Sequence, residues 1–169
     1  MTTLDKLRSE KDAFFRNDPY SPLTDEQKQT FLGLEYFPEN DSLRLVITVQ
    51  RLPEDDIIQV QTNTGETKAY ERYGKFTFRV AGEEVELTIF RSMDSYFLPF
   101  ADSLAGDLTY GAGRYLEPEE LPDGRFQVDF NLAYNPYCAY NDRWSCPLTP
   151  AENRIKAPIR AGEKIFAAH

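Results

Sequence analysis

The spacing of hydrophobic and polar positions changes once along the chain. Residues 3–15 place apolar side chains at near-helical spacing, and Thr2 with Asp5 offers a capping box, so the pattern predicts an amphipathic helix. Thr24 with Gln27 can cap a second short helix in the same way. From about residue 34 onward the period becomes two, which predicts strands.

Most of the predicted strands are short and are separated by turn residues. The segments expected to pair as hairpins are 57–62 with 67–73, 75–80 with 85–90, and 109–116 with 125–132. Pro99 interrupts a short apolar segment at 96–100, so this segment can form only an edge strand or the end of a strand. An extended segment at 157–166 could close the sheet.

Regular strand spacing with helices only at the start predicts a mainly β fold. We expect an antiparallel barrel, because closure removes exposed strand edges, with a sandwich as the alternative. One or two N-terminal helices precede it. The length of 169 residues suits one domain, with a helical segment at 1–33 and a β domain at 34–169.

The charge balance narrows the classes of partner. With 28 acidic and 19 basic residues the net charge is -9, which disfavours nucleic acid and anionic membrane surfaces as partners. A small basic pocket could still bind a small anion. The chain begins without a signal-peptide pattern and holds no apolar run near 18 residues, so we expect a cytoplasmic protein.

The third predicted hairpin carries the candidate site. If its strands are symmetric about their loop, one face holds a set of polar side chains, namely Tyr110, Arg114, Gln127, Asp129 and Asn131. Arg114 would fix an anionic or carbonyl group, Asp129 would serve as base or acceptor, and Asn131 would orient the ligand. Arg114 and Asp129 are therefore the catalytic candidates. Alternatively this face is solvated or holds a structural Arg–Asp network, and a register slip of one residue would separate the two polar sets.

Two segments downstream could complete this site. Asn135 precedes Pro136 in a stretch that cannot be a regular central strand, so we expect a shaped loop there that walls the site. Asn153 and Arg154 are candidate hydrogen-bonding residues in a stretch rich in turn residues. Alternatively, this stretch is only a rigid loop that covers one end of the barrel. Arg154 and Lys164 could add positive charge, with Glu163 as an acid partner.

Seven residues separate Cys138 from Cys146, a spacing that is compatible with buried thiols, a disulfide, or a reactive or metal-binding thiol. His169 is the sole histidine. Its position at the end of the chain weakens zinc-site and Ser-His-Asp interpretations, so acid-base work falls to Asp, Glu, Tyr or Lys. The sequence predicts no metal and no cofactor.

Several motifs together resemble a prokaryotic family defined as an uncharacterised domain of unknown function. These motifs are YGAGRY at 110–115, DFN-x-AYNPYCAY at 129–140, and CPL-x-P-x-ENR at 146–154. Shorter matching segments near the N-terminus extend the resemblance over nearly the whole chain. The resemblance implies a single intact domain and no established substrate, cofactor or catalytic residue.

The leading hypothesis is a protein that binds a small polar or anionic ligand in a β-barrel pocket, with catalysis left open. One alternative is a noncatalytic interaction or structural module that uses the aromatic loop at 134–144, since Tyr and Trp are enriched at such contacts. Another is a thiol-redox protein that uses Cys138 and Cys146. The sequence makes no prediction of the oligomeric state.

Overall fold

Two capped helices open the chain. The structure is a computed structural model that describes residues 2–166. Helix α1 (Thr3–Asn17) and helix α2 (Asp25–Thr30) both begin with a capping box, at Thr2 with Asp5 and at Thr24 with Gln27. Both predicted helices are therefore confirmed. Among residues 2–166, no helix is long and apolar enough to cross a membrane.

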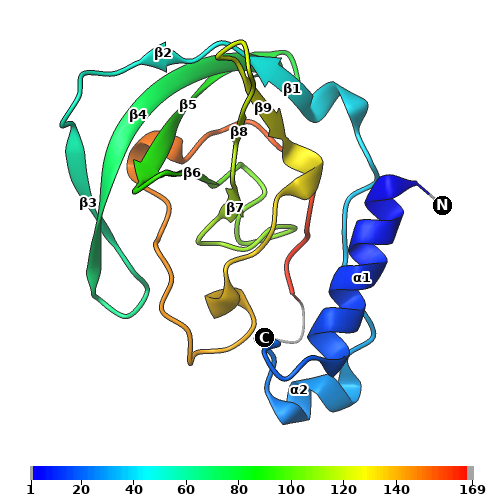
Figure 1. The fold of residues 1–169 in the computed structure, drawn as a ribbon. Coiled ribbons are helices and arrows are strands. Elements are labelled where there is room, and N and C mark those ends of the chain that lie inside the picture. The colour runs from blue at the N-terminus through cyan, green and yellow to red at the C-terminus, as the bar shows by residue number, and fades with distance from the viewer. Residues whose placement is uncertain (1, 167–169) are drawn as a thin grey trace.

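The larger of two antiparallel sheets has six strands and is dominated by a long curved hairpin (Figure 1). Its strands are β2 (Gln50–Arg51), β3 (Ile57–Gln61), β4 (Thr67–Val80), β5 (Glu83–Ser92), β6 (Ser95–Phe100) and β7 (Arg114–Leu116). The β3–β4 and β4–β5 hairpins confirm the first two predicted pairings. The second turn is tighter than expected, because Ala81 and Gly82 both adopt positive φ (52° and 78°) and β5 begins directly after them.

The smaller sheet has the order β1–β9–β8, built from β1 (Arg44–Ile47), β8 (Glu119–Glu120) and β9 (Phe126–Asp129). The third predicted hairpin is therefore wrong. β9 pairs with β8 on one edge and with β1 on the other, whereas β7 pairs with β6 in the larger sheet. Arg114 lies opposite Phe100 instead of Gln127, and Asp129 lies opposite Arg44.

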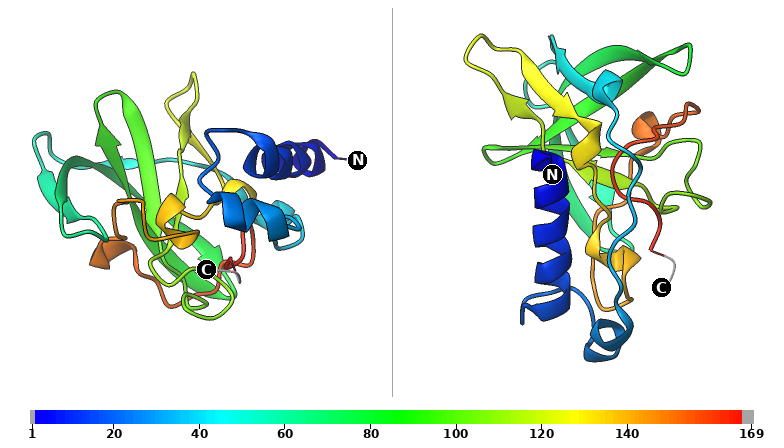
Figure 2. Two further views of the ribbon diagram at one scale, coloured as in Figure 1. Left: turned by 90° about the horizontal axis from the view of Figure 1, so that it is seen from below. Right: turned by 90° about the vertical axis from the view of Figure 1, so that its right-hand side faces the viewer.

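The last third of the chain is mostly irregular and fills the space between the sheets and α1. Short 3-10 turns, η2 (Phe130–Leu132), η3 (Tyr137–Ala139) and η4 (Ala151–Asn153), interrupt it, as η1 (Asp41–Leu43) does before β1. The extended segment at 157–166 forms no regular strand within the described residues, and its one β-bridge pairs Glu163 with Tyr36. Figure 1 shows this segment, drawn in red, running between α1 and the sheets, and the left view of Figure 2 shows α1 on the opposite side of the molecule from β3.

Close packing pins this C-terminal segment in place. A main hydrophobic core joins both sheets to it, with Phe100, Phe130 and Ile159 fully buried. Gly162 adopts φ +79°, and a Cβ there would lie 2.7 Å from the carbonyl oxygen of Ala133 and 2.8 Å from that of Phe130. Only glycine fits this close approach of the C-terminal segment to residues 130–133.

Candidate functional site

The candidate site is organised around Glu163, which is 1% exposed. Its backbone lies between two neighbouring segments, since the N–H of Glu163 donates to the carbonyl of Ala133 (3.0 Å) and the N–H of Lys164 donates to that of Glu35 (2.8 Å). On the same edge the N–H of Phe37 donates to the carbonyl of Gly162 (2.9 Å). These bonds place the carboxylate beneath α1.

Three donors converge on the Glu163 carboxylate. Oε1 accepts from the backbone N–H of Asn135 (3.1 Å) and from the hydroxyl of Tyr140 (2.8 Å), while Oε2 is paired with the Lys11 ammonium of α1. Burial, and then the nearby Glu163 charge, raise the pKa of Tyr140 well above its usual value, so its hydroxyl remains a donor. The buried charge is therefore both paired and hydrogen-bonded.

Lys11 stands at the boundary between the interior and solvent. Its side chain is 30% exposed, against 2% for Glu163, and its ammonium lies 5.1 Å from the ring centroid of Tyr134 and 5.5 Å from that of Phe15. An inner cavity of about 80 Å³ and an outer hollow of about 550 Å³ both have Leu7 and Lys11 in their walls. We call the two spaces together the α1 site.

Unpartnered polar atoms border the inner cavity. The Arg8 guanidinium donates one bond to the carbonyl of Phe37 (3.1 Å) and stacks 4.3 Å above the ring of Tyr36, yet its Nε and Nη2 have no hydrogen-bond partner. The buried hydroxyl of Tyr36, which also lines this cavity, lacks a partner as well. Burial lowers the pKa of Arg8 and raises that of Tyr36. With Arg8 and Lys11 against Glu163, the charged side chains lining the cavity carry a net positive charge.

Arg114 supports this site from behind. It is 1% exposed, and its guanidinium donates to the carbonyls of Ile159 (2.9 Å), Ala161 and Glu163 (3.1 Å), with Asp102 at 3.7 Å. Burial lowers the pKa of Arg114 to about 10 despite the opposing effect of Asp102. Arg114 therefore binds the backbone of the C-terminal segment.

Two of the other predicted residues lie close to Glu163. Asn131 lines the inner cavity, and its side chain is held by the backbone of Asn40 through bonds of 2.8 and 3.0 Å. Asn135 donates its backbone N–H to Glu163 and its side-chain amide to the carbonyl of Lys164 (3.0 Å). The structure therefore gathers Arg114, Asn131 and Asn135 around Glu163.

The remaining predicted residues lie elsewhere. Gln127 and Asp129 line a separate hollow of about 170 Å³, where Asp129 bonds Arg44 (3.2 Å) and caps the N–H of Asn131 (3.0 Å). Tyr110 contacts Cys138 (3.6 Å).

Asn153 is fully buried and its side chain bonds the backbone of Thr88 and Pro99, whereas Arg154 is exposed. The predicted single face does not form, because its two strands belong to different sheets. The pattern did contain one overlooked signal, since Lys11 shares the helical stripe of Leu4 and Phe15.

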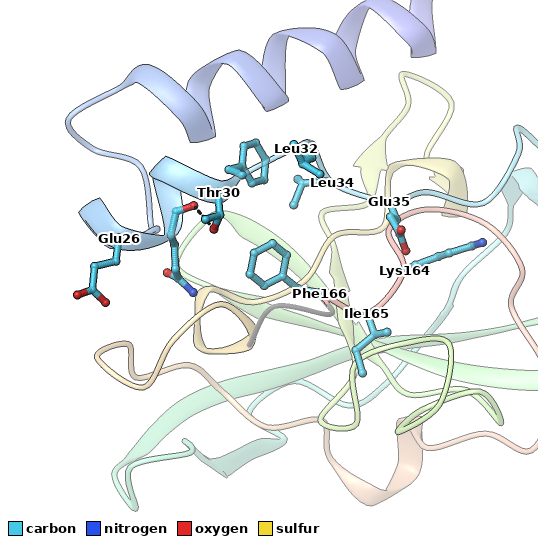
Figure 3. Close-up of a pocket in the computed structure, with 11 residues that line it drawn as sticks. Glu26, Thr30, Leu32, Leu34, Glu35, Lys164, Ile165 and Phe166 are labelled. Atoms are coloured by element: carbon cyan, nitrogen blue, oxygen red, sulfur yellow. Dashed lines mark hydrogen bonds between the residues drawn. The ribbon is translucent and has the colours of Figure 1, made fainter.

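A cleft of about 380 Å³ beneath α2 has a different character (Figure 3). Phe31, Leu34 and Phe166 contribute apolar walls, whereas Glu26 and Lys164 extend away from the cleft. It offers apolar contact without convergent charges. Among residues 2–166, no three His, Cys, Asp or Glu side chains cluster closely enough to hold a metal ion.

Comparisons with known proteins identify relatives of this chain without assigning a reaction. The solution NMR structure of an uncharacterized protein from Haloarcula marismortui is similar, with 36% identity and a TM-score of 0.73 over 98% of this chain and 94% of that one. No curated protein matches the chain. The model of a family described as a protein of unknown function, DUF1684, matches residues 29–164, so the chain belongs to the DUF1684 family.

Proposed function

We propose that this protein binds a small anionic ligand with a planar or apolar portion at the α1 site. The observation that carries the proposal is a net positive cavity with unpartnered donors in a chain whose net charge is -9. A buried donor without a partner costs about 1–3 kcal/mol, so a ligand that supplies an acceptor recovers part of that free energy.

The dimensions of the two spaces define the ligand. A cavity of about 80 Å³ corresponds to two or three waters at roughly 30 Å³ each, which suits a carboxylate or phosphate group near Arg8 and Tyr36. The outer hollow presents the aromatic residues Phe14, Tyr134 and Tyr137. These side chains favour a ring or an apolar chain on the same ligand.

The interaction-module alternative has less support. Within the aromatic loop Tyr140 is fully buried, and Tyr137 packs against Trp144 with ring centroids 5.1 Å apart. These side chains already have partners inside the chain, which leaves less of their surface for a protein partner.

Thermal-shift and calorimetric titrations with benzoate and phenyl phosphate test the proposal, with benzyl alcohol as the uncharged comparison. At 100 times its dissociation constant a bound ligand adds about 2.7 kcal/mol of stability. The anionic compounds should stabilise the protein and benzyl alcohol should not. If no anionic compound binds, or if the alcohol binds equally well, the proposal is wrong.

A pair of variants on α1 locates the binding site. Arg8→Met removes a charge at the inner cavity and should weaken binding of the anionic probe by about tenfold or more, as expected for a charge-assisted hydrogen bond worth about 1.5–3 kcal/mol. Lys6→Met removes the same charge from an exposed position on the same helix. Equal affinity in the two variants would place the ligand elsewhere.

A further inference from the structure

A second cluster, away from Glu163, contains both cysteines. Cys138 lies in η3, and its thiol is 3.6 Å from the hydroxyl of Tyr110. Cys146 lies eight residues further along the chain and belongs to the same buried aromatic cluster. Both cysteines are free and buried, and each thiol affects the pKa of the other.

Backbone hydrogen bonds fix the segment that carries each thiol. Cys146 is fixed to the β3–β4 loop, because its N–H donates to the side chain of Asn63 (2.7 Å) and its carbonyl accepts from the N–H of Asn63 (3.1 Å). η3 is closed by the N–H of Ala139 donating to the carbonyl of Pro136 (2.9 Å). Both cysteines are therefore held in one buried cluster by segments whose backbone is hydrogen-bonded within the fold.

The surroundings make the two thiols unequal. Hydrogen bonds from the Cys138 thiol, and further ones from the backbone N–H groups of Cys138 and Tyr137, lower the pKa of Cys146 to about 6, with Lys68 contributing a favourable charge. The same interaction raises the pKa of Cys138. Cys146 is also the more accessible residue, at 9% exposed against 3%. A reagent therefore meets a thiolate at Cys146 first.

We propose that Cys146 and Cys138 form a reversible thiol–disulfide pair, in which Cys146 attacks a small-molecule disulfide and Cys138 resolves the intermediate. The Cys146 thiolate attacks one sulfur of the small disulfide, forms a mixed disulfide and releases one thiolate. Cys138 then gives its proton to that thiolate and attacks Sγ of Cys146. The mixed disulfide breaks and releases the second small-molecule thiolate, which takes up a proton from water. The protein loses two electrons, and the small disulfide is reduced to two thiols.

The sequence permits a direct test on the unaltered protein. The chain has two cysteines, and cleavage by trypsin after Arg143 separates them into peptides 126–143 and 144–154. The folded, reduced protein is treated with oxidised glutathione, free thiols are alkylated, and the masses of the protein and its peptides are measured. The expected product has lost two hydrogens and yields the two peptides joined by a disulfide.

The order of reaction is tested with iodoacetamide on the folded protein. Peptide 144–154 should be alkylated at least about tenfold faster than peptide 126–143, since the thiolate is the nucleophile. The rate at which Cys146 is labelled should rise with pH and reach half of its maximum near pH 6. Faster labelling of Cys138 would overturn the assigned roles. If both thiols stay free in the folded protein while urea-unfolded protein is oxidised, the proposal fails.

Two variants separate the steps. Cys138→Ser should stop at a stable mixed disulfide on Cys146, whereas Cys146→Ser should leave Cys138 largely unmodified under the same conditions. A mixed disulfide of similar yield on each variant would contradict the division of roles. The measurements on the unaltered protein decide the question even if a variant fails to fold.

Discussion

Replacing Arg114 by methionine should destabilise the fold strongly. Methionine fills part of the same buried volume but donates no hydrogen bond, so the carbonyls of Ile159, Ala161 and Glu163 lose their guanidinium donors. Asp102, which is 5% exposed, loses its cationic neighbour at 3.7 Å. Removing one partner of a buried ion pair costs about 3–5 kcal/mol, because the other charge remains buried and uncompensated.

Equilibrium unfolding in urea measures this effect. With a loss of about 4 kcal/mol and a slope of about 2 kcal/mol per molar urea, the midpoint should fall by about 2 M. Arg160→Met is the matched control, since it removes the same charge from an exposed position of the same segment and should change stability by less than about 0.5 kcal/mol. Midpoints that agree for the two variants would refute the assigned role of Arg114.

Two related variants identify which part of the interaction matters. Arg114→Lys keeps the charge but cannot reproduce the planar fork that reaches several carbonyls, so it should recover part of the stability. Adding Asp102→Asn to Arg114→Met removes the uncompensated carboxylate and should also recover part of the loss, because residues in one network are coupled by about 0.5–3 kcal/mol. Strict additivity would show that Asp102 is not a source of the cost.

Two further predictions concern the segments that position Glu163. Gly162→Ala should cost more than Gly124→Ala, by at least about 2 kcal/mol in urea unfolding, because both residues have positive φ but only the Cβ at Gly162 meets neighbouring atoms; equal losses would contradict this. Tyr140→Phe removes the hydroxyl that donates to the Glu163 carboxylate and should cost about 1–3 kcal/mol, whereas Tyr20→Phe, at an 83% exposed tyrosine, should be neutral. If Tyr140→Phe unfolds at the same urea concentration as Tyr20→Phe, the hydroxyl of Tyr140 does not stabilise the fold as we expect.

The parts of the fold that depend on local interactions were predictable from the sequence. The helix starts at Thr2 and Thr24 are set by side chains three residues apart, and the hairpins joining β3, β4 and β5 connect neighbouring strands through short turns. In each case the alternation of side chains and the turn chemistry lie within about a dozen residues. The antiparallel, mainly β class follows from those signals and is confirmed.

The long-range pairings were not predictable in the same way. β9 could equally have paired with any strand of similar alternation, and its actual neighbour β1 lies about 80 residues earlier, as the pairing of Leu45 with Val128 shows. The predicted single polar face did not form for the same reason, because the prediction assumed that the strand of Arg114 pairs with the strand of Asp129. The pairing of Lys11 with Glu163 joins residues 152 apart. A single sequence carries no local signal for such a contact.

The polar residues of the C-terminal third have a common structural role that affects every functional test. Arg114, Asn131 and Asn135 use their side chains to bond backbone groups where the chain is irregular, whereas Asn153 bonds the backbone of Thr88 in β5 and Pro99 in β6. These bonds replace the ladder of a regular strand, since buried backbone groups must be paired. Loss of binding in a variant of any of these residues would therefore report unfolding as readily as a lost ligand contact.

Arg8 differs from this group and is the residue whose replacement separates binding from stability. It lies on α1 rather than in the irregular segment, and two of its three guanidinium nitrogens have no partner within the chain. Replacing it removes one bond to Phe37 and relieves two unpaired donors, so the cost to folding is limited. A bound anion gains directly from those donors. Binding that is lost in Arg8→Met, at nearly unchanged stability, would therefore place the anion at the inner cavity beside Glu163.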